Sequence, residues 1–180
     1  MSSEFEAKNQ VVPAGPALPE SVDANGDKLH QFITFSVENE EYGVDILAVR
    51  EIIAWSEVTR LPNTRDYVRG VLNLRGSILP VFDLRCRFGM GLTEVSKTHV
   101  IIVLFVEGKL IGILADSVSQ ILLVSDSDFR SVPDVNLIVD QEYLAGLVSA
   151  DERMVAILDI DHLFEPAVLR QSIADAEAHT

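Results

Sequence analysis

The chain has 180 residues, with 14 basic and 28 acidic side chains and a formal net charge of −14. This acidity disfavours binding to nucleic acid, whose phosphates require a basic surface, and docking on an anionic membrane surface. The single cysteine excludes an intrachain disulfide, and the longest apolar run, Val100–Val106, is far shorter than the ~20 residues of a membrane-spanning helix, so we expect a cytoplasmic protein of one domain or two small ones.

Strand-like segments follow a polar start. Residues 1–29 combine prolines and glycines with scattered charges, and we expect them to form a flexible tail. Alternation from Gln31 to Val37 predicts a strand, whereas helix signals are confined to a possible turn after Asp45 and a stretch from about Pro166. Many short strands with frequent turns are typical of barrels or a sandwich. The other strand-like runs are Tyr42–Val44, Val71–Leu74, Ser77–Phe82, His99–Val106, Leu110–Ala115, Tyr143–Val148 and Arg153–Leu158.

An internal repeat organises the middle of the chain. A shift of 76 residues aligns Tyr67 with Tyr143, Gly70 with Gly146, Val81 with Ile157, Asp83 with Asp159 and Phe88 with Phe164. Upstream, a shift of 69 residues aligns Gly43 with Gly112, Val44 with Ile113, Val49 with Val118 and Ile52 with Ile121. Because the two shifts differ by seven residues, the second copy carries an insertion between Ile121 and Tyr143.

The repeat predicts two similar β-modules, at residues 30–88 and 97–165. A connector at 89–96 joins them, and a helical segment is expected at 166–180. A module of about 60–70 residues has a marginal core on its own. We therefore expect the two modules to pack together and to share a groove.

Positions that both copies share are best explained by the fold. Asp83 and Asp159 each follow a strand, where a turn or N-cap carboxylate is expected. Gly70 and Gly146 are typical of glycines at bulges or close backbone approaches. The alternative is that each glycine borders a partner surface.

One hairpin tip differs between the copies. Asn73–Gly76 aligns with Ser149–Glu152, so Arg-Gly in the first copy stands where Asp-Glu stands in the second. A tip is a poor place for core packing, and a reversal of charge there indicates a docking contact. An ordinary solvated turn is the alternative.

The same region is rich in arginine. Six arginines and three acids lie between Glu57 and Gly91, which gives a local net charge of +3 in an acidic chain. Guanidinium groups pair well with carboxylates, so this island suggests an acidic protein partner. The alternative is that the arginine stems cover a face of a sheet. The six are Arg60, Arg65, Arg69, Arg75, Arg85 and Arg87.

Nothing in the sequence predicts catalysis. The four histidines lack the spacing of a metal site, and no phosphate-binding loop or nucleophile elbow is present. Cys86 lies between Arg85 and Arg87, which are expected to lower its pKa, but no histidine is spaced to activate it. We expect no enzyme activity, no cofactor and no metal site.

Six segments together carry a family resemblance: Glu40–Leu47, Val49–Ile52, Gly70–Gly76, Leu79–Arg85, Gly112–Asp116 and Glu142–Gly146. In this order they resemble CheW, the family of bacterial chemotaxis coupling proteins. The resemblance covers about residues 30–165, and the Asn73–Gly76 tip with its flanks is quite specific. The departures are the longer segments at both ends.

The resemblance implies an all-β fold of two SH3-like, five-stranded barrels packed together. It also implies a non-catalytic adaptor, which joins the cytoplasmic tips of chemoreceptors to the regulatory domain of the histidine kinase CheA and helps to build the receptor array at the inner face of the membrane. Receptor docking would use Val49, Glu51, Ile52, Gly70 and Arg75. Kinase docking would use Val58, Thr59 and Arg60, with a second contact at Arg130, Asp134 and Val135.

Other functions stay open at this stage. One is a similar scaffold in a non-flagellar pathway, such as surface sensing or pilus control. Another is a small enzyme or ligand-binding double barrel, which a ligand-induced rise in melting temperature would reveal. Since we see no phosphotransfer domain and no room for a receiver domain after Glu165, we expect a stand-alone coupler rather than part of a kinase or of CheV.

Overall fold

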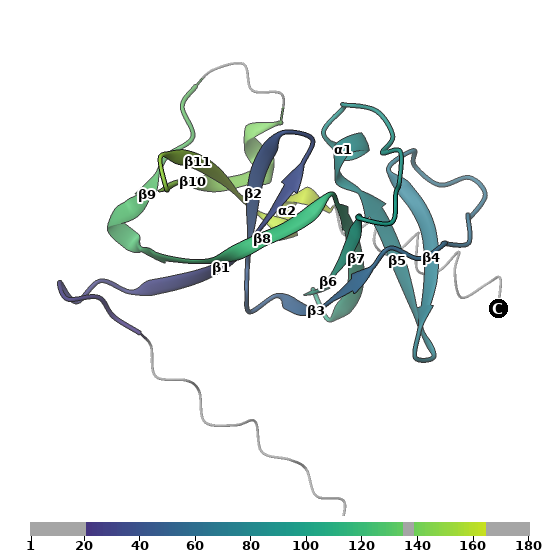
Figure 1. The fold of residues 1–180 in the computed structure, drawn as a ribbon, viewed down its shortest axis with the longest axis horizontal. Coiled ribbons are helices and arrows are strands. Elements are labelled where there is room, and N and C mark those ends of the chain that lie inside the picture. The colour runs from purple at the N-terminus through teal and green to yellow at the C-terminus, as the bar shows by residue number, and fades with distance from the viewer. Residues whose placement is uncertain (1–20, 135–138, 165–180) are drawn as a thin grey trace, which may run out of the picture.

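A computed structural model describes residues 21–134 and 139–164 of the chain. These residues form two packed β-sheets with a few short helices, so the predicted all-β fold with two SH3-like modules is confirmed (Figure 1). None of the helices within these two ranges is long and apolar enough to cross a membrane. The elements are β1 (Leu29–Val37), β2 (Glu40–Asp45), β3 (Val49–Ala54), β4 (Val68–Leu74), β5 (Ser77–Asp83), α1 (Leu84–Arg87), β6 (Val100–Val106), β7 (Lys109–Ala115), β8 (Ser117–Ser125), η1 (Asp126–Asp128), β9 (Phe129–Arg130), η2 (Gln141–Tyr143), β10 (Leu144–Ala150), β11 (Arg153–Leu158) and α2 (Ile160–Leu163).

The two copies of the repeat exchange their first hairpins. Strands β1 and β2 of the first copy join the six-stranded sheet, in the order β8-β1-β2-β11-β10-β9. Strands β6 and β7 of the second copy join the five-stranded sheet, in the order β3-β6-β7-β5-β4. Each exchanged hairpin pairs in parallel with the last strand of the other copy, β2 with β11 and β7 with β5. The sheets therefore differ from the continuous segments 30–88 and 97–165 that the repeat indicates.

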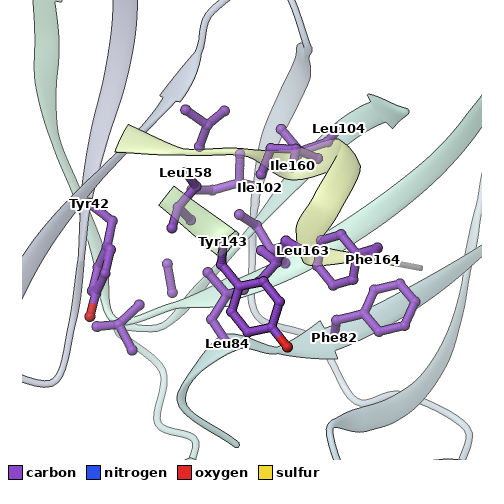
Figure 2. Close-up of a cluster of buried hydrophobic side chains, with 14 of the residues drawn as sticks. Tyr42, Phe82, Leu84, Ile102, Leu104, Tyr143, Leu158, Ile160, Leu163 and Phe164 are labelled. Carbon is purple, nitrogen blue, oxygen red and sulfur yellow. The ribbon is translucent and has the colours of Figure 1, made fainter. Parts of the chain in front are cut away.

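A single apolar core joins the two sheets (Figure 2). It takes buried side chains from both sheets and from α1 and α2, and the ring centroids of Phe82 and Phe164, one from each copy of the repeat, lie 4.6 Å apart within it. Because modules this small have marginal cores when isolated, the shared core accounts for their close packing. The side chains labelled in Figure 2 are Tyr42, Phe82, Leu84, Ile102, Leu104, Tyr143, Leu158, Ile160, Leu163 and Phe164.

Arg87 lies where the two copies meet. Its guanidinium carbon is 4.8 Å from the ring centroid of Tyr67 and 4.6 Å from that of Tyr143, and these tyrosines are repeat partners. Its Nε donates to the carbonyl oxygen of Leu163, the residue that aligns with Arg87 itself, at 3.2 Å. Cation–π contacts of partly desolvated arginines contribute about 0.5–2 kcal/mol each. This side chain therefore ties the second copy to the first.

The two shared aspartates are helix caps, as predicted. The Asp83 carboxylate accepts a hydrogen bond from the Cys86 N–H at 3.2 Å, at the start of α1. The Asp159 carboxylate accepts one from the His162 N–H at 3.2 Å, at the start of α2. Each cap satisfies a backbone donor that a helix of one turn leaves without a partner.

Three strands lie outside the predicted runs: β3, β8 and the two-residue β9. Register shifts interrupt the pairing of both β3 and β8, which obscures their alternation. The turn after Asp45 is present but not helical. The structure describes residues 21–29 of the expected N-terminal tail. In this stretch Val22 pairs with Lys28 in an isolated bridge, and β1 begins at Leu29. Residues 1–20 and the expected helical segment at 166–180 lie outside the described residues.

Candidate docking surfaces

The hairpin tip between β4 and β5 is a tight two-residue turn. Arg75 and Gly76 have φ of +49° and +86°, and the side chain of Asn73 accepts a hydrogen bond from the Gly76 N–H at 2.9 Å. The tip between β10 and β11 has the same backbone, with φ of +47° and +66° at Asp151 and Glu152. An arginine in this left-handed conformation costs energy relative to glycine, so the turn itself does not require Arg75. Its side-chain contacts must be considered instead.

Arg75 forms an ion pair with Glu51. Its Nη1 donates to Oε2 of Glu51 at 3.3 Å, and its Nη2 pairs with Oε1. Glu51 lies on the edge strand β3, and Arg75 lies in the turn that follows β4, the other edge strand of the five-stranded sheet, so the pair links the two ends of the strand order. The Arg75 side chain remains 72% exposed. A cavity of about 550 Å³ adjoins the pair, and its other lining residues are Arg50, Leu74, Ser77, Val103, Phe105 and Leu110.

The five predicted receptor residues do not form one continuous wall. Val49 and Ile52 lie opposite residues of β6 that belong to the shared core, and Ile52 is 41% exposed. Glu51 lies opposite Val103, which belongs to a separate core inside the five-stranded sheet. Since residues opposite one another in an antiparallel pair share a face, β3 presents these two groups on opposite faces. Gly70 is buried in β4 and belongs to neither group.

Gly70 permits a close backbone contact. It has a φ of +143°, and a Cβ there would lie 2.7 Å from the carbonyl carbon of Thr59 and nearer still to the oxygen. Thr59 forms two backbone hydrogen bonds with Val71, at 2.9 and 2.8 Å. The predicted close-approach role of Gly70 is thus confirmed. The close contact at Gly70 positions two of the predicted kinase residues, Thr59 and Arg60, and Arg60 is exposed. The third, Val58, packs on the core of the five-stranded sheet.

The second predicted kinase contact occupies the equivalent place in the other module. Arg130 pairs with Leu147 of β10, the residue that aligns with Val71. A Cβ on Gly146 would lie 3.2 Å from the carbonyl oxygen of Arg130, as one on Gly70 would approach Thr59. The side chains of Arg130 and Asp134 are exposed, and Val135 lies outside the described residues. The two modules thus present similar backbone edges.

Sequence reasoning missed several exposed apolar side chains. On the edge strand β8, Ile121 is 62% and Leu123 is 55% exposed. Ile121 aligns with Ile52 of β3, so the two copies place an exposed isoleucine at equivalent positions of their edge strands. The repeat contains this signal, although β8 was not predicted as a strand. Leu47, in the turn before β3, is also exposed.

A second cavity, of about 520 Å³, lies between the modules. It shares Arg50 and Phe105 with the cavity beside Arg75, so the two cavities are neighbours. The guanidinium of Arg50 covers the Phe105 ring at 4.8 Å and donates to the Leu47 carbonyl oxygen. Three aspartates, Asp45, Asp159 and Asp161, also line this second cavity. A lining that combines Arg50, these aspartates and apolar side chains suits a protein segment with both charged and apolar residues.

The pKa of Cys86 differs from the expectation. Burial raises the pKa of its thiol, and the nearby carboxylate of Asp83 raises it further. The expected lowering by Arg85 and Arg87 is therefore wrong. Arg85 instead forms an ion pair with a glutamate, and the guanidinium of Arg87 lies against tyrosine rings. A thiol with a raised pKa is a poor nucleophile at neutral pH.

Ser96, His99 and Asp116 are hydrogen-bonded in a line. Ser96 Oγ lies 3.0 Å from Nδ1 of His99, and Nε2 of this histidine lies 3.2 Å from Oδ1 of Asp116. The Ser96 N–H also donates to Nδ1 at 3.0 Å, so this loop occupies the acceptor that a general base would need. Ser96, His99 and Asp116 are not among the residues that line the two cavities described above. We interpret these hydrogen bonds as structural, because they hold the loop before β6 in place.

No metal site is evident in the parts of the chain that the structure describes. Within residues 21–134 and 139–164, no three His, Cys, Asp or Glu side chains are grouped to hold an ion.

Ionisation of Tyr42 limits the stability of the protein at alkaline pH. Burial, with a smaller effect of Glu40, raises the pKa of Tyr42 to about 12 from 10.0. Its contribution to stability is therefore complete below pH 10 and is lost as the pH rises from 10 to about 12. Relative to Tyr42→Phe, the wild-type free energy of unfolding should fall by up to ~2–3 kcal/mol over this range. Urea titrations at several pH values measure it, and parallel profiles would contradict it.

Comparison with known proteins agrees with this architecture. A family model described as the CheW-like domain matches residues 31–167. The chemotaxis protein CheW of Rhizobium meliloti (strain 1021) is 40% identical over 134 residues, which cover 74% of this chain and 86% of that protein. CheW of Klebsiella aerogenes is 41% identical over 133 residues, 74% of this chain and 80% of that protein.

A solved structure has the same fold. The scaffolding protein TtCheW from Thermoanaerobacter tengcongensis superposes with a TM-score of 0.71 at 32% identity, covering 77% of this chain and 90% of that one. The family match spans both sheets and includes the Arg75 tip and both shared caps. This chain belongs to the CheW-like family.

Proposed function

We propose that this chain is a non-catalytic chemotaxis adaptor that couples the cytoplasmic tips of chemoreceptors to the histidine kinase CheA. The observation that carries the proposal is the family match over both modules, including the Asn73–Gly76 tip. Relatives named as chemotaxis proteins favour this pathway over the non-flagellar alternative. The adaptor would act in the cytoplasm, held at receptor clusters by its protein partners.

Receptor docking involves both faces of β3 in this proposal. The exposed Ile52 and its neighbour Val49 offer apolar contact for a receptor helix, as in helix-in-groove recognition. Arg75 and Glu51 fix the register of that helix through charge complementarity. Gly70 acts indirectly, because it shapes the strand that carries the tip.

Kinase docking uses the backbone edges at Thr59 and Arg130. Val58, Thr59 and Arg60 form the contact on the five-stranded sheet, and Arg130, Asp134 and Val135 form the contact on the other. What supports this assignment is that Thr59 and Arg130 lie at equivalent places, each against one of the two glycines that the repeat aligns. Two such edges on opposite modules suit a scaffold, since one chain then bridges two partners. A change in kinase activity would follow from unequal binding to its active and inactive arrangements.

The test is reconstitution with receptor-containing membranes and a CheA kinase. Wild-type protein should stimulate kinase phosphorylation strongly and Arg75→Ala only weakly, because loss of a charge-assisted contact weakens receptor docking by about 1–3 kcal/mol. Arg153→Ala is the matched control, since Arg153 is also an exposed arginine and flanks the acidic tip of the other module. Co-sedimentation with the membranes measures the docking step separately.

The outcomes distinguish a wrong receptor site from a wrong coupling function. Equal stimulation by wild type and Arg75→Ala would keep the adaptor and move the receptor site away from the tip. Absence of both stimulation and co-sedimentation, with the protein folded, would contradict the coupling function itself.

A further inference from the structure

A small cavity on the five-stranded module gathers half of the arginine island. It has a volume of about 180 Å³ and lies beside Arg60, next to the proposed kinase contact. Three arginines and one aspartate line it, which gives the lining a formal charge of +2 in a chain of net charge −14. We call it the arginine cavity, and its lining residues are Arg60, Leu61, Thr64, Arg65, Asp66, Val68, Arg69 and Leu92.

Two of these arginines have no side-chain partner among the residues that the structure describes. Among the described residues, Arg60 and Arg65 are exposed and form no hydrogen bond or ion pair through their side chains. The third, Arg69, lies 3.6 Å from the buried Asp83 carboxylate and is only 12% exposed. The remaining island arginines are also engaged: Arg75 with Glu51, Arg85 with Glu38 and Arg87 with Tyr67 and Tyr143. Arg60 and Arg65 are therefore the island arginines whose guanidinium groups remain available to an outside partner, and both line this cavity.

The walls of the cavity are fixed by the fold. On one side, the connector is anchored where Thr93 donates from its N–H and its Oγ to Asp83, at 2.8 and 2.7 Å. The preceding Leu92 accepts a hydrogen bond from Arg85 at 3.2 Å. On the other side, the Thr59 backbone is paired with β4. A binding site whose walls are already ordered loses less conformational entropy when it binds a ligand.

The lining combines cations with apolar surface. Leu92 is 48% exposed at the rim, and Leu61 and Val68 contribute further apolar wall. Guanidinium groups pair with carboxylates through charge-assisted hydrogen bonds. A carboxylate side chain with an apolar neighbour would therefore satisfy both parts of the lining. The cavity is also continuous with the Val58–Arg60 contact, because Arg60 belongs to both.

We infer that the arginine cavity receives an acidic side chain, flanked by an apolar one, from the kinase regulatory domain that docks on this module. This inference rests on the proposed function and assigns a new contact within it. Arg65 and Arg60 supply the charge, Leu92 supplies the apolar contact, and Arg69 is a positioning residue held by Asp83.

The experiment compares the affinity of the CheA regulatory domain for wild type, Arg65→Gln and Arg65→Glu by calorimetry at low and at moderate salt. Arg65→Glu should weaken binding about tenfold or more, and Arg65→Gln less, since reversal adds repulsion to the lost hydrogen bond. Wild-type affinity should fall with salt more steeply than that of Arg65→Glu. Arg153→Glu makes the same change of charge at an exposed arginine of the other module and should bind as wild type does.

Each result decides the matter. Equal affinity of wild type and both Arg65 variants overturns the inference and leaves the proposed function intact. Equal weakening by Arg153→Glu and Arg65→Glu also overturns it, because only net charge would then matter. No binding by any variant contradicts the proposed kinase partner and the inference with it. Inorganic phosphate is titrated into the free protein as a separate probe, and saturable binding that requires Arg65 without competing with the kinase would assign the cavity to a small anion instead.

Discussion

Replacement of Gly70 by alanine should destabilise the protein by at least ~3 kcal/mol, because two costs coincide at this position. A φ of +143° is strained for any residue with a Cβ. In addition, the new methyl group would meet the Thr59 carbonyl, 2.7 Å away at its carbon atom. The methyl fits only if the Thr59–Arg60 segment moves away from β4, which also breaks its two hydrogen bonds with Val71.

A matched control separates the two costs. Gly76 in the tip also has a positive φ, of +86°, but a Cβ there would meet nothing within 4 Å. Gly76→Ala should therefore lose only about 1 kcal/mol, the cost of the left-handed backbone. Urea denaturation measures both free energies. Similar losses in the two variants would show that backbone strain alone matters and that the contact with Thr59 yields easily.

The same substitution also affects docking. If Gly70→Ala is folded at low temperature, the displaced Thr59–Arg60 segment should weaken kinase binding, whereas Gly76→Ala should retain it. Gly70 was assigned to receptor docking by family resemblance. Its burial in β4 indicates instead that its effect on any partner is indirect.

The repeat predicted much of the fold. It indicates the caps at Asp83 and Asp159, the paired glycines, and the aligned isoleucines Ile52 and Ile121. It did not predict the hairpin exchange. A sequence shift shows which segments are similar, but both an exchanged and an unexchanged pairing satisfy the same alternation of side chains. The choice depends on the parallel contacts of β2 with β11 and of β7 with β5, which are tertiary.

The candidate site was predicted as residues rather than as a surface. Glu51 and Arg75 were both named, but their ion pair spans 24 residues and joins two sheet edges, and no local pattern reveals it. The register shift between Val49 and Glu51 is equally invisible in the sequence, yet it decides which face each side chain takes. The island of arginines was visible, but which of them are neutralised internally depends on partners such as Asp83 and Glu38.

Asp83 should contribute more to stability than any other carboxylate with an assigned role here. Its side chain is fully buried, and its two oxygens accept hydrogen bonds from the Cys86 N–H, the Thr93 N–H and the Thr93 hydroxyl. Arg69 adds a cation 3.6 Å away. Asp83→Ala leaves these donors and a nearly buried guanidinium without their partner. Loss of one member of a buried charged pair typically costs 3–5 kcal/mol, and we expect about that decrease in the free energy of unfolding.

Asp159→Ala is the natural control, because Asp159 caps α2 in the same position of the repeat. Its side chain is 31% exposed, and its other partner is the exposed His162. Removing it should cost only about 1 kcal/mol, the usual value of an N-cap. The difference between the two variants therefore measures what Thr93 and Arg69 add to a simple cap. Equal losses in urea denaturation would contradict a special role for Asp83.

The comparison also links stability to docking. Asp83 anchors the connector through Thr93 and holds Arg69, so it fixes two sides of the arginine cavity. Where Asp83→Ala remains folded, kinase affinity should fall although Asp83 itself is inaccessible to a partner. Asp159→Ala should leave that affinity unchanged, since α2 does not line the cavity. Because Ala145 aligns with Arg69, the described part of the second copy offers Asp159 no equivalent arginine, so the cationic site is particular to the first module.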